Sequence, residues 1–162
     1  MALEKLSSKI GIDVERSAVG EINVVNKMND LNSNFGGEGN GGVILRESHL
    51  GRDSLVAATL VLNRMAQSNK TLSSIFTSLP QYKIIKDKIL IKNVDSDKLI
   101  DKVGSLFQDA EKSTIDGIKF TWDDKWIHLR KSNTEPIMRI YSEAKTKQLA
   151  QDLVKSVKNL IN

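Results

Sequence analysis

The 162-residue sequence contains no cysteine, only two prolines, and few aromatic residues, which make up 5% of the chain. Without cysteine the protein has no disulfides and no thiolate metal ligands, so its core must form by packing and hydrogen bonding. No apolar run approaches the roughly 20 residues of a membrane-spanning helix. With a hydrophobic content of 40%, these absences predict a soluble cytoplasmic protein with no membrane partner.

The N-terminal residues also lack the pattern of a secretion signal, which needs a basic start followed by an apolar block. Residues 1–6 instead have helical spacing and an early acid, Glu4. The net charge is +4, and residues 86–162 carry 15 basic against 12 acidic side chains. Such an excess suits anionic small molecules as well as nucleic acid, and it is too thinly spread to indicate a nucleic-acid-binding stripe. Nucleic-acid binding by the second half is a weaker alternative, so we expect no nucleic-acid partner.

The most informative stretch is RKSNTEP, residues 130–136, which is followed by a second arginine at Arg139. Two guanidiniums can offer paired donors to phosphate oxygens, and hydroxyls and turn N–H groups can add more. The flanking residues 126–129 and 137–141 are typical of strands, so a symmetric connection would make Arg130 and Arg139 cross-strand partners. Opposed like charges destabilise a strand pair unless something bridges them. The pattern indicates a phosphate site, and an exposed polar turn is the alternative.

A second distinctive stretch is glycine-rich and reads FGGEGNGGVI over residues 35–44. It satisfies GxGxxG, but a dinucleotide site needs a hydrophobic strand before the loop and a helix after it. Here polar residues 28–34 precede the loop, and the extended segment 43–45 follows it. Glu38 could instead accept hydrogen bonds from two neighbouring sugar hydroxyls, with glycines that let the backbone approach the ring. A flexible turn with a solvated acid is the alternative.

Both stretches resemble motifs of the α-D-phosphohexomutases, the family of phosphoglucomutase, phosphomannomutase and phosphoglucosamine mutase. Residues 130–139 are similar to the phosphate-binding loop of the family's last domain, and residues 35–44 resemble an archaeal-like form of its third-domain sugar loop. The segments 19–21 and 49–53 lie where the family has a VG[DE] turn and the start of the following helix. The resemblance thus implies a phosphorylated hexose as the ligand.

The site residues follow from the same resemblance. It implies that Glu38 and Asn40 bind the sugar. The residues that it implies for binding the phosphate are Arg130, Ser132, Asn133, Thr134 and Arg139. In the commoner sugar loop, GExSGH, serine and histidine occupy the positions of Asn40 and Gly42, so what replaces that histidine is an open question. His49 is a candidate for a polar role, although a lone histidine before a helix is more typical of capping.

The resemblance also shows which parts are missing. The family's phosphoserine loop, similar to TASHNP, and its Mg²⁺ loop, DxDxDR, do not occur in this sequence. The chain therefore resembles the C-terminal part of a mutase that interconverts 1-phospho and 6-phospho sugars, with no catalytic residue and no metal ligand of its own. Mg²⁺ and a sugar bisphosphate activator would act in the parent enzyme, whose remaining domains would be its partners. A stand-alone phosphosugar- or anion-binding module without catalysis is the alternative.

The pattern of apolar residues predicts an α/β segment followed by an α+β domain. We assign residues 1–84 to the C-terminal part of the family's domain 3, with helices over 2–10, 52–67 and 71–78 and strands at 22–25 and 42–45. Residues 85–162 would form domain 4, which the resemblance makes TATA-binding-protein-like. There the order is strand, helix, three strands, helix, so two helices would cover one face of an antiparallel sheet. Residues 82–91 are expected to be extended and lysine-rich, and we place the domain boundary within them, near 83–88, as an exposed connection about which the two halves move.

Overall fold

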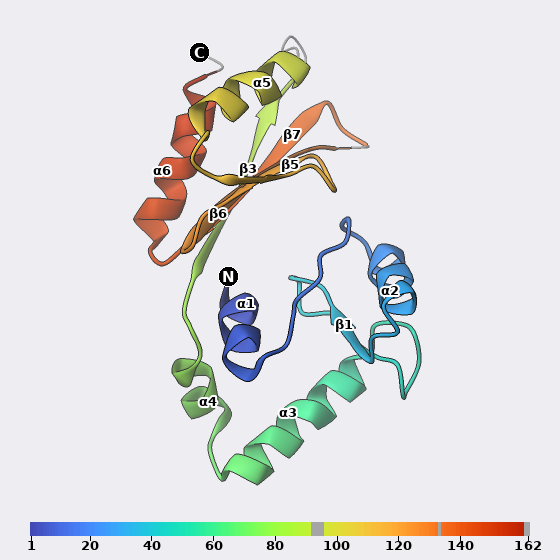
Figure 1. Ribbon diagram of the computed structural model, residues 1–162. Coiled ribbons are helices and arrows are strands. Elements are labelled where there is room, and N and C mark those ends of the chain that lie inside the picture. The colour runs from blue at the N-terminus through green and yellow to red at the C-terminus, as the bar shows by residue number, and fades with distance from the viewer. Residues whose placement is uncertain (92–95, 133, 161–162) are drawn as a thin grey trace. The chain divides into compact units, whose positions relative to one another are not determined.

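The computed structural model describes residues 1–91, 96–132 and 134–160. The chain forms two compact units (Figure 1). One combines Met1–Ile12 with Gln81–Asn162, and the other is Asp13–Pro80. None of the helices in the described ranges has both the length and the apolar character that crossing a membrane requires.

The unit of residues 13–80 begins with a helix packed against a hairpin. Helix α2, Glu21–Asp30, contacts the antiparallel strands β1, Phe35–Gly37, and β2, Val43–Leu45. A glycine is needed at the contact, because a Cβ at Gly36 would lie 2.4 Å from Met28 Sδ. Arg46, directly after β2, donates from Nη2 to the Met28 carbonyl at 2.8 Å. This bond satisfies a carbonyl at the C-terminal end of α2, where intrahelical donors are missing.

The strand predicted at residues 22–25 is wrong, because these residues lie in α2. Their β-branched side chains favour a strand by propensity, but tertiary packing overrides it. As a helix, the segment places Val24 and Met28 one turn apart, so both can lie against Gly36. The buried strand predicted at 42–45 is confirmed, with Ile44 fully buried in β2.

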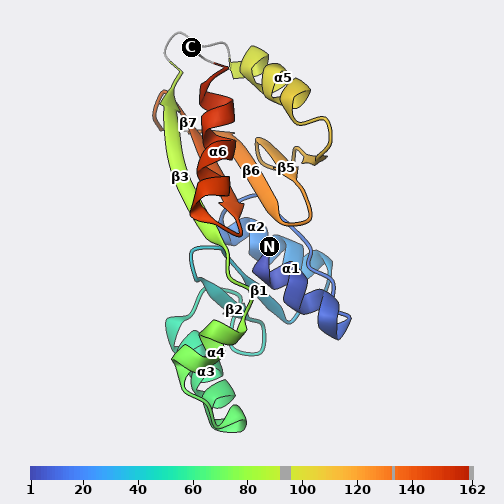
Figure 2. The same cartoon turned by 90° about the vertical axis from the view of Figure 1, so that its left-hand side faces the viewer.

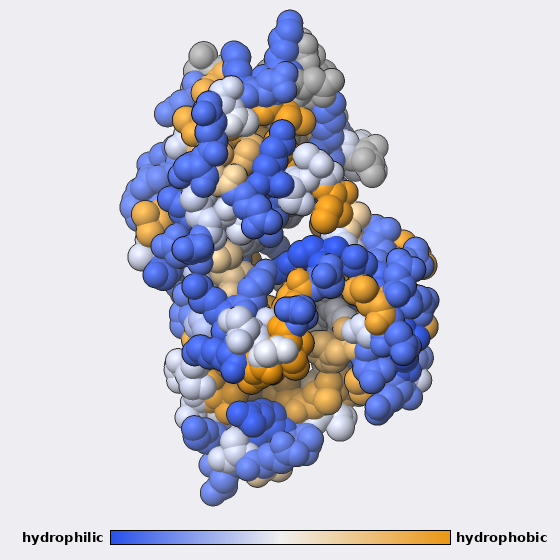
Figure 3. Space-filling view, in the orientation of Figure 1, coloured by the Kyte–Doolittle hydropathy of each residue, from blue (hydrophilic) through white to orange (hydrophobic). Residues whose placement is uncertain are grey.

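The two helices predicted after the hairpin are confirmed. Helix α3, Ser54–Ser68, is capped by Asp53, whose Oδ1 accepts hydrogen bonds from the N–H groups of Leu55 and Val56 at 2.7 and 3.0 Å. Helix α4, Leu72–Ser78, is capped by Thr71. No residue of α3 is buried, and apolar side chains gather over it in Figure 3. The exposed large apolar residues of α3 are Leu55, Leu60, Val61 and Leu62.

The other unit contains a five-stranded antiparallel sheet in the order β3-β7-β6-β5-β4. Its strands are β3 Lys83–Leu90, β4 Glu111–Ser113, β5 Ile118–Thr121, β6 Lys125–Lys131 and β7 Ile137–Ala144. Its helices are α1 Ala2–Ser7, followed by a 3₁₀ turn at Ser8–Ile10, α5 Ser96–Leu106 and α6 Lys147–Lys158. The predicted helix over residues 2–10 and the predicted order of the second half are confirmed, apart from the short polar edge strand β4.

Helices α5 and α6 contribute to one hydrophobic core on one face of this sheet, and α6 runs along β3 and β7 (Figure 2). Cross-strand partners supply the sheet side of the core, since Ile118 pairs with Leu129 and Leu129 with Ile140. The core residues are Leu99, Val103, Phe107, Ile118, Phe120, Ile127, Leu129, Met138, Ile140, Leu153, Val154 and Val157. The predicted arrangement of two helices on an antiparallel sheet is confirmed. The opposite face carries charged side chains such as Arg130 and Arg139 together with Trp126 and Tyr141.

The exposed connection expected at residues 83–88 is wrong, because these residues form most of β3 and pair with β7. The period-2 burial of this segment shows why, since alternate side chains such as Ile85 and Ile89 pack against the core. Lys158 Nζ also donates to Asp87 Oδ2 at 2.6 Å and ties α6 to β3. The boundary at which the chain passes from one unit to the other lies between Pro80 and Gln81. The assignment of domain 3 to residues 1–84 and domain 4 to residues 85–162 stays a prediction.

Candidate functional site

The loop between β6 and β7 brings the two predicted arginines together. Arg130 and Arg139 are register partners in the β6–β7 pair, so the cross-strand pairing predicted from the sequence is confirmed. Both lie on the face opposite the buried Ile127 and Leu129. The loop closes with the Ser132 N–H donating to the Ile137 carbonyl at 2.9 Å. Two positive charges therefore flank one short turn.

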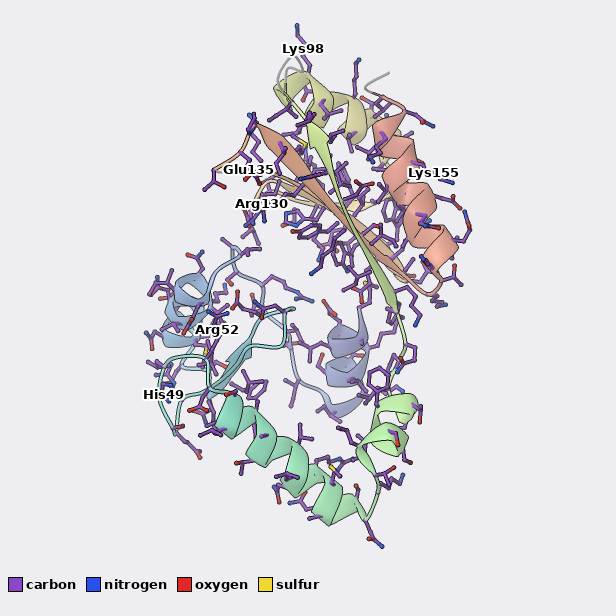
Figure 4. All side chains as sticks on the ribbon, turned by 180° about the vertical axis from the view of Figure 1, so that it is seen from behind. His49, Arg52, Lys98, Arg130, Glu135 and Lys155 are labelled. Carbon is purple, nitrogen blue, oxygen red and sulfur yellow. The ribbon has the colours of Figure 1, made fainter. Side chains whose placement is uncertain are left out.

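Each of the two arginines lies close to an acidic side chain. Arg130 Nη1 lies 3.0 Å from Asp116 Oδ2, and Arg139 Nη2 lies 3.9 Å from Glu135 Oε2. Figure 4 shows Arg130 and Glu135 at the same end of the sheet. These carboxylates reduce the repulsion that the two opposed arginines would otherwise have. An incoming anion would therefore compete with Asp116 for Arg130.

The sequence analysis did not predict Asp116 as a site residue, although the register of the β5–β6 hairpin could have indicated it. The register pairs Ile118 with Leu129, so continuing it places Gly117 opposite Arg130 and Asp116 one residue further, next to Arg130. Gly117 fixes this approach, since its φ is +71° and a Cβ there would lie 2.3 Å from the Leu129 carbonyl oxygen. His128 Nε2 also contacts the Asp116 carbonyl oxygen. His128 thus helps to hold the segment that pairs with Arg130.

The hydroxyl groups of the loop form a small cluster of their own. Ser132 Oγ and Thr134 Oγ1 lie 3.4 Å apart, and the Thr134 N–H donates to Ser132 Oγ at 3.4 Å. The structure thus brings together four of the five predicted phosphate-binding residues. Asn133 lies outside the described residues. Rotatable hydroxyls next to paired guanidiniums form a donor set that suits a tetrahedral anion.

In the other unit, the glycine loop turns tightly between β1 and β2. The Glu38 N–H donates to the Gly42 carbonyl at 2.9 Å, and the Gly41 N–H donates to the Glu38 carbonyl at 3.0 Å. The side chain of Asn40 accepts a hydrogen bond from the Gly42 N–H at 3.0 Å, so its Oδ1 stabilises the turn. Gly41 has a φ of +98°, a backbone conformation that favours glycine.

Glu38 points toward Arg52, which the sequence analysis did not single out. Arg52 Nη1 lies 3.0 Å from Glu38 Oε2, while Arg52 Nε donates to Glu21 Oε2 at 2.8 Å and the Arg52 N–H to Glu21 Oε1 at 2.9 Å. Glu38 Oε2 is buried and receives no well-aligned hydrogen bond from the described residues. The sequence could have indicated these two residues through the motif segments 19–21 and 49–53, which contain Glu21 and Arg52.

The pKa values of this cluster follow from its contacts. The hydrogen bond from the Arg52 N–H, assisted by its guanidinium, holds the pKa of Glu21 below its usual value. The hydrogen bond to Glu21 in turn raises the pKa of Arg52. Asp53 has a lowered pKa because it accepts the N–H groups of Val56 and Leu55. His49 lies beside this cap, with Nδ1 3.9 Å from Asp53 Oδ2. Figure 4 shows Arg52 near the hairpin and His49 farther out on the loop.

The described residues contain no group of three or more histidine, aspartate or glutamate side chains placed to hold a metal ion. They do not supply a ligand set for the Mg²⁺ that the resemblance implies for the parent enzyme.

Comparison with known protein families gives two matches. Residues 1–82 match the family described as "Phosphoglucomutase/phosphomannomutase, alpha/beta/alpha domain III". Residues 90–160 match "Phosphoglucomutase/phosphomannomutase, C-terminal domain". Both matches agree with the order of the glycine loop and the β6–β7 loop along the chain.

Individual relatives extend these matches over nearly the whole chain. A phosphoglucomutase/phosphomannomutase of Thermococcus kodakarensis is 36% identical over 157 residues, which cover 93% of this chain and 33% of the relative. A phosphoglucosamine/phosphogalactosamine mutase of Sulfurisphaera tokodaii is 32% identical and is covered to 36%. The chain thus spans about a third of the length of these relatives. A crystal structure of a phosphoglucomutase/phosphomannomutase family protein from Burkholderia thailandensis has the same fold over 96% of this chain and 35% of its own, with a TM-score of 0.74 at 23% identity.

Proposed function

Because the chain belongs to the phosphoglucomutase/phosphomannomutase family, we propose that it binds a phosphorylated hexose through its two loops. In this proposal Arg130 and Arg139, with the hydroxyls and N–H groups between them, hold a phosphate that is not being transferred. Glu38 accepts hydrogen bonds from the sugar, and Asn40 shapes the loop around it. Asn133 belongs to the proposed phosphate site by resemblance alone.

The register pairing of Arg130 with Arg139 carries this proposal. Opposed arginines on a strand pair cost stability, and each acid beside them offsets only part of it. A phosphate can accept paired hydrogen bonds from both guanidiniums at once. The strand pair thus provides a rigid frame for an anion, and the hydroxyls of Ser132 and Thr134 lie within the same loop.

We further propose that the chain acts as the C-terminal part of a longer mutase that interconverts 1-phospho and 6-phospho sugars. The substrate of such an enzyme must present each end in turn, so one fixed anchor for the non-reacting phosphate serves both orientations. The other domains would supply the phosphorylated serine and the Mg²⁺ site, and a sugar bisphosphate would be the activator. The TATA-binding-protein-like class of the second domain and the cytoplasmic location also stay proposals.

The exposed apolar side chains of α3 are evidence for the proposal that other domains of a longer enzyme pack against this chain. Four of its large apolar side chains are exposed, with Leu55 at 77% and Leu62 at 63%. A family described as an alpha/beta/alpha domain places a sheet between helix layers, whereas the matching unit here has only the hairpin β1–β2. Burying such side chains against a sheet would stabilise each by about 1.5–3 kcal/mol.

Amide chemical shifts measured by NMR test the binding proposal. We expect glucose 6-phosphate to shift two groups of amides, one within residues 36–43 and one within residues 130–139. Sulfate, which has no hydroxyls like those of a sugar, should shift the second group alone. If glucose 6-phosphate shifts the amides of neither loop, the assignment of the binding site is wrong. If it shifts only amides of residues 130–139, the result supports the alternative of an anion-binding module without a sugar site.

A further inference from the structure

Arg52 links two acids that are far apart in the sequence. Its Nε and its backbone N–H both bond to Glu21, at 2.8 and 2.9 Å, while its Nη1 reaches Glu38 at 3.0 Å. The side chain of Glu38 is only 13% exposed, whereas that of Glu21 is 38% exposed. The hydrogen bond from Nε to Glu21 therefore holds the guanidinium, and the more buried Glu38 lies against the same group.

The path of the Arg52 side chain depends on a glycine. A Cβ at Gly42 would lie 2.4 Å from Arg52 Cδ and 3.1 Å from Cγ. These atoms are in the middle of a side chain whose head is held by two carboxylates, so the arginine cannot turn away without losing those contacts. A Cβ at Gly39 in the same loop would meet nothing within 4 Å. The space over Gly42 is thus occupied by Arg52.

We propose that Arg52 is a positioning residue that holds the Glu38 carboxylate for binding sugar hydroxyls and so sets affinity for the hexose, with Gly42 keeping its path open. This inference rests on the proposed function, in which Glu38 contacts the sugar. The cluster has two carboxylates and one guanidinium, a net charge of −1, so it suits hydroxyl donors and disfavours a phosphate. Arg52 would hold the Glu38 carboxylate in one orientation through its ion pair with Oε2.

The test compares the affinity of the full chain for glucose 6-phosphate with its affinity for sulfate, by calorimetry. We expect Glu38→Gln to reduce the ratio of the two affinities roughly tenfold, because hydrogen bonds to a charged acceptor are lost. Arg52→Met should reduce it by a similar factor and leave sulfate binding unchanged. The double variant should be no weaker than Glu38→Gln, since residues that act as a unit are not additive.

Gly42→Ala provides an independent arm that changes neither charged residue. It should lower the affinity ratio as Arg52→Met does and should shift the Nε–H NMR signal of Arg52, whereas Gly39→Ala should leave that signal in place. Arg52→Lys keeps a charge but cannot bridge both acids, so it should recover only part of the ratio. If Arg52→Met fails to fold, Arg52→Lys and Gly42→Ala decide the matter.

The outcomes separate this inference from the proposed function. If glucose 6-phosphate binds wild type no better than sulfate does, or if Glu38→Gln leaves the ratio unchanged, the assignment of Glu38 to the sugar is wrong. If Glu38→Gln lowers the ratio while Arg52→Met and Gly42→Ala preserve it, the role of Arg52 is overturned and that of Glu38 stands.

Discussion

Replacing Arg130 by alanine should weaken anion binding strongly and change unliganded stability little. A hydrogen bond to a charged group contributes about 1.5–3 kcal/mol, and 1.4 kcal/mol is a tenfold change in Kd. Arg130 already shares its guanidinium with Asp116 at 3.0 Å, and this competition lowers its net contribution. We therefore expect a loss near the lower limit, roughly tenfold in the Kd for sulfate.

Two opposing effects determine the stability of unliganded Arg130→Ala. The ion pair with Asp116 is lost, but its side chains are 29% and 24% exposed, and such partly solvated pairs contribute at most about 1 kcal/mol. Repulsion from Arg139 is relieved by about 0.2–1 kcal/mol. The net change should stay within about 1 kcal/mol, which is less than about 8 °C in Tm for a domain of this size.

A thermal-shift titration with sulfate measures both quantities. Asp116→Asn is the matched variant, because it breaks the same ion pair but removes the competing acid. It should strengthen sulfate binding, whereas Arg130→Ala weakens it. Lys131→Ala, which changes the charge of the neighbouring residue, should have a much smaller effect than Arg130→Ala. If sulfate raises the Tm of wild type, Arg130→Ala and Arg139→Ala equally, the proposal that Arg130 and Arg139 bind one phosphate is refuted.

Three further predictions concern pH, backbone geometry and turnover. The hydrogen bond from Lys158 lowers the pKa of Asp87, so its stabilisation is present above the unfolded pKa of about 3.9 and is lost as pH falls through the folded pKa. Melting curves of wild type and Asp87→Asn should differ at pH 7 and converge in acid. Gly117→Ala should destabilise by more than about 1 kcal/mol, because of its positive φ and the Leu129 carbonyl, whereas Gly104→Ala, with open space around it in α5, should raise Tm. Purified chain with glucose 1-phosphate, glucose 1,6-bisphosphate and Mg²⁺ should show no mutase turnover by ³¹P NMR, and turnover above a blank would contradict the proposed division between domains.

The sequence by itself determined the features that depend on short-range pattern. The strand patterns of residues 126–129 and 137–141 predicted β6 and β7, and the symmetry of residues 130–139 about their turn was enough to pair Arg130 with Arg139. The pattern of apolar residues predicted the two helices that cover one face of the sheet. The motifs also placed Glu38 in a loop rather than in a dinucleotide-binding turn. These inferences succeeded because hairpin register and helical periodicity are local properties.

Tertiary structure decided what local pattern could not. Residues 22–25 have strand propensity but form a helix because Val24 and Met28 pack on Gly36. The lysine-rich residues 83–88 resemble an exposed linker, yet they pair with β7 and alternate into the core. Arg52, Glu21 and Asp116 became site residues only when folding brought them beside Glu38 and Arg130, across 14 to 31 residues of sequence. Contacts at such separations depend on how elements pack, and the spacing of residues along one element does not encode that packing.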